Sequence, residues 1–179
     1  MRAQTIIAAL AVAGLAASAV NAAGTTDPKN LLLRSSDFPA GAKRVSFGGK
    51  TGGIKIPRTV RGKSAYVAYK FKNGSRSESV AEAVGTVASS GDAHDVFVKL
   101  KRDITRVQSL HRIKVPRYGD EQVSLRFSLQ VASSAVVLVR SGNMLWEVVV
   151  TEIPSVSKAQ ATAELEKYAR KAKDRVARG

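Results

Sequence analysis

The sequence predicts an α+β fold: an antiparallel sheet of about five to six strands, two main helices packed on it and a short N-terminal helix. Three observations lead to this prediction. Residues 122–131 alternate strictly between apolar and polar side chains, as a strand with one buried face does. Residues 92–110 and 158–177 repeat apolar residues at steps of three and four, as amphipathic helices do. Runs of strands between isolated helices are typical of a helix-covered antiparallel sheet.

The short N-terminal helix is expected to start at Asp27-Pro28. This pair offers an N-cap followed by proline at the first helical position. The leucines at 31–33 give the helix an apolar face, and the helix should end before Phe38-Pro39.

Several strand-like segments follow. Residues 43–48 predict a short strand, and residues 54–60 contain a proline that limits them to an edge or a loop. Residues 64–72 alternate clearly, and the Asn-Gly pair after them is a hairpin turn signal. Residues 79–89 mix helix and strand formers, and a strand is favoured because the next segment is a far better helix.

That helix is expected over residues 92–110, with Ser90 or Asp92 as its cap. Its apolar stripe is Val96, Phe97, Leu100, Ile104, Val107 and Leu110. Because each large side chain contributes roughly 1.5–3 kcal/mol when it is fully buried, the stripe should hold the helix against the sheet.

The second half of the chain predicts three consecutive antiparallel strands and a final helix. Strand 122–131 should bury Val123, Leu125, Phe127, Leu129 and Val131. Residues 135–140 and 144–151 form a hairpin around a short loop that contains glycine. In its second strand, Trp146 should be a core residue. Ser157 and Gln160 form a capping box for a helix that buries Ala161, Leu165, Tyr168, Ala169, Ala172 and Val176.

The first residues indicate export. Arg2 is followed by an uncharged run of small and apolar residues over 5–20, which is typical of a secretory signal peptide. We expect residues 1–22 to be this peptide, cleaved after Ala19 or Ala22, residues 23–30 to be a polar leader, and residues 31–178 to form one α+β domain. No later run has membrane length, so the mature chain is expected to be secreted or extracytoplasmic, without a membrane span. The sequence has no cysteine, and its core must therefore stabilise it without disulfides.

The charge balance favours anionic partners. Twenty-nine basic residues against 14 acidic ones give a net charge of +15, which attracts anions. Residues 38–77 contain no acid at all. We name seven of their cations the anion patch: Lys43, Arg44, Lys50, Lys55, Arg58, Arg61 and Lys63. The patch could bind an anionic envelope polymer or lipid headgroups, or it could simply be a solvated basic surface.

The same stretch contains "GGKTGG" at residues 48–53, which ends like a phosphate-binding loop. Such a loop needs an earlier glycine where Arg44 stands, and a helix after it. Here two glycines and a proline follow, so we expect no nucleotide and interpret the segment as a turn between strands.

Catalytic, metal and cofactor signals are missing. His94 and His111 are the two histidines, and zinc usually needs three or four ligands. No nucleophile motif accompanies either histidine. Asp120-Glu121 is expected to have a structural turn role, paired with Arg117 or Arg126. We therefore predict no catalytic residue, no metal site and no cofactor.

Five segments stand in a familiar order: "LLLRSSDFPAGAKR", "AHDVFVKLKRDI", "YGDEQVSLRFS", "VVLVRSGNMLWEVVV" and a capped Ala/Lys-rich helix. This layout resembles small exported domains of actinobacterial lipoproteins and the extracellular sensor domains of membrane serine/threonine kinases. Shared motifs are a Leu-x-x-x-Asp-hydrophobic-Pro start, a Gly-Asp-Glu turn at 119–121 and a strand pair with Arg-x-Gly-Asn. The chain lacks the disulfides common in the kinase sensors, and it has no kinase segment. The resemblance implies an α+β fold with a groove between sheet and helix, and a binding role.

We therefore expect a secreted, non-enzymatic, sensor-like module of the cell envelope that binds an anionic or amphipathic ligand. Two alternatives remain open. The charge also suits a nucleic-acid-binding protein, although export and the absence of a recognised motif weigh against it. A small hydrolase with an unrecognised site is the other.

Overall fold

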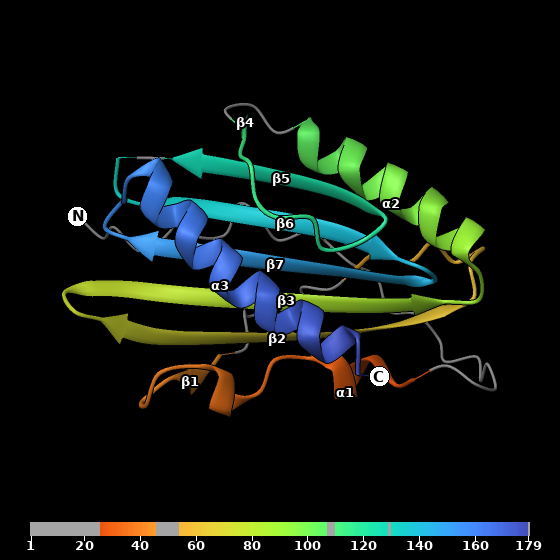
Figure 1. Cartoon of the computed structure of the whole chain (residues 1–179), viewed down its shortest axis with the longest axis horizontal. Coiled ribbons are helices and arrows are strands. Elements are labelled where there is room, and N and C mark those ends of the chain that lie inside the picture. Colours follow the sequence, from red (N-terminus) through yellow and green to blue (C-terminus); the bar gives the residue numbers. More distant parts are fainter. Residues whose placement is uncertain (1–25, 46–53, 107–109, 129, 179) are drawn as a thin grey trace.

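The computed structural model describes residues 26–45, 54–106, 110–128 and 130–178. The expected signal peptide and the "GGKTGG" segment lie outside these residues, as does Lys50 of the anion patch. The fold is the α+β class that the sequence predicts (Figure 1).

One antiparallel sheet organises the molecule. Within the described residues it has seven strands in the order β1-β2-β3-β7-β6-β5-β4, where five to six were expected. The long strands are β2 (Gly62–Asn73), β3 (Arg76–Val87), β5 (Glu121–Ser128), β6 (Ser133–Ser141) and β7 (Met144–Ile153). The two edge strands, β1 (Lys43–Arg44) and β4 (His111–Arg112), have two residues each. Strands this short carry almost no periodicity, and this explains the lower expected number.

Tight turns join the long strands. The turn between β2 and β3 places Gly74 at φ 61°, a left-handed conformation that favours glycine. In the turn between β6 and β7, Gly142 adopts the same left-handed conformation, at φ 58°. The strand expected over residues 79–89 is confirmed as part of β3 up to Val87, and Ser89 belongs to the start of the next helix instead, as its N-cap. The strand expected over 122–131 ends earlier, at Ser128, and Val131 is exposed instead of buried.

Helix α3 (Lys158–Val176) covers one face of the sheet, and Figure 1 shows it lying across the strands. Ser157 and Gln160 form the predicted capping box. All six residues of the predicted apolar face are buried. They pack on alternate residues of the central strands, and Trp146 is fully buried among them.

Helix α2 (Ser90–Thr105) packs on the other face of the sheet, against a second apolar cluster. Its cap is Ser89, whose side chain accepts a hydrogen bond from the Asp92 N–H, and not Ser90 or Asp92 as expected. The helix ends five residues before the predicted boundary, and Leu110 lies beyond it, partly buried against the same cluster.

The N-terminal segment lies on the α3 side of the molecule. Helix α1 (Pro28–Leu31) has Asp27 as its N-cap, as predicted, and a 3-10 helix, η1 (Ser35–Asp37), follows it. We name residues 28–38 the N-terminal strap. The strap buries the three leucines at 31–33 and Phe38 in the core under α3. Among the described residues, no helix is long and apolar enough to cross a membrane.

Candidate functional site

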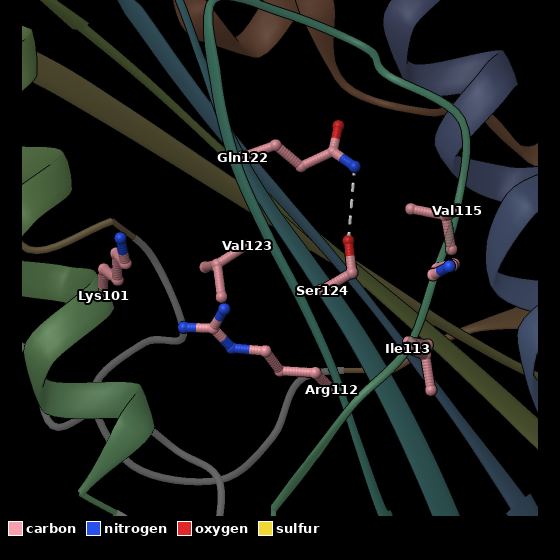
Figure 2. Close-up of a pocket in the computed structure, with 8 residues that line it drawn as sticks. Lys101, Arg112, Ile113, Val115, Gln122, Val123 and Ser124 are labelled. Atoms are coloured by element: carbon pink, nitrogen blue, oxygen red, sulfur yellow. Dashed lines mark hydrogen bonds between the residues drawn. The ribbon is translucent and has the colours of Figure 1, made fainter.

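A cavity of about 360 Å³ opens at the β4 edge of the sheet, beside α2 (Figure 2). We name it the edge cavity. It is lined by Lys101, Arg112, Ile113, Lys114, Val115, Gln122, Val123 and Ser124. These residues come from α2, from β4 and the segment after it, and from β5, so three parts of the chain meet there.

Backbone pairing sets the outer wall of the edge cavity. Arg112 is paired with Leu125 of β5, and the next residue, Ile113, donates its N–H to the Ser124 carbonyl at 3.1 Å. The chain then leaves the sheet. Ile113 is buried in the α3-side core, and this burial fixes the direction of the departing segment.

Gln122 holds that departing segment in place. Its Oε1 accepts from the Tyr118 N–H at 3.0 Å, and its Nε2 donates to the Pro116 carbonyl at 3.1 Å. The same Nε2 lies 3.4 Å from the Ser124 Oγ, and Figure 2 shows this hydrogen bond between the two β5 side chains. These hydrogen bonds and the Ile113–Ser124 backbone bond anchor the segment after β4 to β5, and so they fix one wall of the cavity.

The lining combines positive charge with apolar surface. Lys101, Arg112 and Lys114 are exposed cations, and none of the eight lining residues is acidic. Within the described residues, no ion pair joins any of the three cations to a carboxylate. Ile113 and Val123 are buried apolar residues beside them. Unpaired cations next to apolar side chains can hold an anion that also carries an apolar group.

The sequence carried a signal for this cavity. Residues 99–117 contain seven basic residues and a single acid, Asp103. The acid-free run at 38–77 is longer, and it drew the prediction to the other edge of the sheet. The cavity itself could not be read from the sequence, because it depends on β4 being recognised as an edge strand.

Three described members of the anion patch, Lys43, Arg44 and Lys63, belong to β1 and β2 at the opposite end of the strand order from β4. Lys43 and Arg44 form β1 and are exposed, and Lys43 is paired with Lys70 of β2. Lys55, Arg58 and Arg61 are exposed in the segment before β2, and Lys63 is half-buried at its start. Lys43 pairs near the end of β2, so roughly 20 Å of strand separates it from Lys63. The segment that carries Lys55 and Arg58 packs Ile54 and Ile56 in the α2-side cluster, so the described patch residues do not meet at one point.

Arg140 joins two of the sequence motifs. It donates from Nε to Glu121 and from Nη1 to Asp120 Oδ2 at 3.2 Å, which links the Gly-Asp-Glu turn to the Arg-x-Gly-Asn hairpin. The Gly142 N–H also donates to Asp120 Oδ2, at 2.8 Å. The expected pairing of Asp120-Glu121 with Arg117 or Arg126 is therefore wrong. Arg117 donates instead to two backbone carbonyls of the turn.

His94 of α2 completes this cluster, with its Nδ1 2.8 Å from Glu121 Oε1. Burial on its own raises the pKa of Glu121, but hydrogen bonds from His94 and Arg140 and the Arg140 charge bring that pKa below its ordinary value. The carboxylate thus stays ionised as the anchor of the turn. His111 lies apart, in β4. Within the part of the chain that the structure describes, no group of three or more His, Cys, Asp or Glu could hold a metal ion.

Comparison with known proteins gives one similar structure. No protein-family model matches the chain, and no curated protein sequence is similar to it. Among solved structures, it is similar to the extracellular domain of PknH from Mycobacterium tuberculosis. The match covers 80% of this chain and 94% of that one, with a TM-score of 0.43 and 9% sequence identity.

Proposed function

We propose that this chain is an extracytoplasmic, non-enzymatic module that binds an anionic ligand at the edge cavity. One observation carries the proposal: three cations from separate positions in the chain line a cavity that no carboxylate lines. Cations without carboxylate partners keep their full attraction for an incoming anion. The signal-peptide pattern at residues 1–22 supports the extracytoplasmic setting.

The lining also suits an amphipathic anion. Lys101, Arg112 and Lys114 would meet the charged head, while Val115 and Val123 would contact an apolar part. The volume, about 360 Å³, is at the small end of the range of ligand sites. The expected ligands are therefore single anionic groups with a short apolar portion, or one headgroup of a larger envelope lipid or polymer.

The anion patch is kept as a second contact for a polyanion. Its described members have no ion-pair partner within the described residues. A long envelope polymer could contact this edge as well as the cavity, whereas a small anion would use the cavity alone. Nucleic acid remains an alternative polyanion for the same surface.

The structure favours binding over hydrolysis at this site. The two carboxylates at Asp120 and Glu121 form ion pairs with Arg140, and Glu121 also pairs with His94. The Arg140 Nη1 donates a further hydrogen bond to Ser90 Oγ at 3.3 Å. No described contact places a serine against the His94 ring. The cluster lies at the α2 N-terminus, and none of its members lines the cavity.

The test uses decyl phosphate below its micelle concentration as the probe, with binding followed by calorimetry. In one variant Lys101, Arg112 and Lys114 are replaced by alanine. In the charge-matched control Lys55, Arg58 and Arg61 of the anion patch are replaced, so both variants lose three positive charges. We expect the first variant to weaken binding at least tenfold and the control to weaken it less than threefold, since one good charge-assisted contact is worth about 1.5–3 kcal/mol.

Equal weakening in the two variants would show that only net charge matters, and the cavity would lose its role. A salt titration and an uncharged analogue separate the electrostatic part of the binding from the apolar part. Raising the ionic strength should weaken binding of the phosphate head, and decanol, which lacks the charge, should bind far more weakly than decyl phosphate. Release of inorganic phosphate from the probe would instead favour the hydrolase alternative.

A further inference from the structure

A buried carboxyl group fastens the N-terminal strap to the sheet. Glu82 lies in β3 on the face that α3 covers, and only 1% of the residue is exposed. One of its oxygens, Oε2, accepts a hydrogen bond from the Leu33 N–H of the strap. The other, Oε1, has no hydrogen-bond partner among the described residues.

Among the residues that the structure describes, no cation forms an ion pair with Glu82. The positive charge of Arg175 on α3 acts on Glu82 and lowers its pKa, but the Arg175 guanidinium is held by Asp37 of the strap through Nε at 2.9 Å and Nη2 at 2.7 Å. Lys171 of α3 donates to the Asp37 carbonyl oxygen. On the flanking strands, the residues paired with Glu82 are Val67 and Val148, which are apolar.

An ionised carboxylate in this place would be costly. A buried charge needs a partner, whereas a neutral carboxyl group needs only hydrogen bonds. The charges of Asp37 and Arg175 nearly cancel at Glu82, because these two residues already form an ion pair with each other. Burial, the largest effect, raises the pKa of Glu82 to about 8, against the smaller lowering effects of the Leu33 hydrogen bond and the Arg175 charge.

We propose that Glu82 is a proton-dependent latch for the N-terminal strap: the strap is held firmly when the carboxyl group is neutral and is released more readily when it ionises. Opening the strap lets water reach Glu82 and lifts Phe38 from Tyr69 and Tyr168, whose ring centroids lie 4.2 and 5.3 Å from its own. The latch lies under the strap and α3, away from the edge cavity, and does not depend on the proposed anion site.

The direction of the pH effect follows from the raised pKa. A carboxyl group whose pKa is higher in the closed state stabilises that state fully below its ordinary value of 4.5. This stabilisation is lost as the pH rises from there through about 8. The strap should therefore be most secure in acid and loosest above pH 8.

The Leu33 amide reports directly on the latch, because its N–H makes the hydrogen bond. Hydrogen exchange of this amide is measured by NMR from pH 5 to pH 8 and divided by the intrinsic rate at each pH. In the wild-type chain we expect protection of Leu33 to fall at least tenfold, since each unit of raised pKa allows up to about tenfold. Amides in the middle of α2, on the other sheet face, should change much less.

Glu82→Gln removes the titration but keeps an oxygen that can accept from Leu33. In this variant the protection of Leu33 should no longer depend on pH. The control, Asp103→Asn, removes an exposed carboxylate of α2 and should keep the wild-type pH profile. A Leu33 protection that is independent of pH in the wild type, or a Glu82→Gln variant that keeps the wild-type slope, would overturn the proposal.

A measurement on the unaltered chain covers the case in which Glu82→Gln does not fold. The side-chain carboxyl carbons are labelled with ¹³C, and the Glu82 resonance is followed through a pH titration. A midpoint two or more units above that of an exposed glutamate supports the latch. A midpoint in the ordinary range shows that the carboxylate ionises without opening the strap, and this result rejects it.

Discussion

Replacing Arg140 by alanine should weaken the fold substantially, because this side chain ties together the turn, the hairpin and α2. The Arg140 side chain is 13% exposed. It donates to Glu121, to Asp120 Oδ2 at 3.2 Å, to Ser90 Oγ at 3.3 Å and to the Gly142 carbonyl at 3.1 Å.

The size of the effect depends on how far each partner is exposed to water. The side chain of Asp120 is 54% exposed, so its ion pair should contribute at most about 1 kcal/mol. The side chain of Glu121 is 26% exposed, and a hydrogen bond to a charged group contributes about 1.5–3 kcal/mol. Because these contributions do not add fully, we expect a total loss of about 3 kcal/mol. For a domain of this size, such a loss lowers the melting temperature by roughly 6–12 °C.

Urea denaturation followed by tryptophan fluorescence provides the assay, since Trp146 is fully buried. Arg117→Ala is the matched control, because Arg117 is an exposed arginine of the same turn that bonds backbone carbonyls alone. Its loss should cost less than about 1 kcal/mol. If Arg140→Ala cost no more than the control, Arg140 would not be the link between the motifs.

The pH dependence gives a second check on the Arg140–Glu121 pair. The pKa of Glu121 is lowered in the folded chain, so the stabilisation is present above the ordinary carboxyl pKa and is lost as the pH falls through the folded-state value. The difference between wild type and Arg140→Ala should therefore shrink between pH 7 and pH 3. A difference that stays constant over this range would contradict the ion pair as its source.

Two further substitutions test the packing. Gly119→Ala would place a Cβ 2.5 Å from the Arg140 carbonyl oxygen, and urea denaturation should show a free energy of unfolding lower by at least about 1–3 kcal/mol. The control is Gly91→Ala in α2, where the added Cβ meets only Ser89 Oγ at 3.7 Å. This control should raise the free energy of unfolding by about 0.5–1 kcal/mol. Tyr168→Phe removes a buried hydroxyl that has no hydrogen-bond partner among the described residues. Thermal denaturation should therefore show an unchanged or higher melting temperature. A drop of several degrees would show that the hydroxyl does make a stabilising hydrogen bond.

The elements that the sequence predicts well are those whose signal is local. The apolar face of α3 and its capping box need only residues within one helix, and the structure confirms both. The Gly142 turn is equally local. The predicted burial of Val131 is wrong, because the end of a strand depends on its partner strand and not on local sequence. Strict alternation continues past the point where β5 loses its partner, and only the pairing with β6, which ends at Ser128, shows this.

The edges of the sheet and the candidate site depend on long-range contacts, and for this reason the sequence could not supply them. Strand β4 is two residues long, and it exists because His111 and Arg112 pair with β5. Without β4 the basic run at 99–117 has no cavity to line. Glu82 likewise resembles an ordinary polar residue of a strand, and its burial depends on the strap and α3 meeting above it.

The most direct test of the central claim is to map the amide chemical shifts of the ¹⁵N-labelled chain as decyl phosphate is added. If the edge cavity is the anion site, saturable shifts should concentrate at Lys101, residues 112–115 and residues 122–124. The β1 edge, with Lys43 and Arg44, should move little at the same concentration. Shifts confined to the β1 edge, or no saturable shift anywhere, would contradict the assignment of the edge cavity as the binding site.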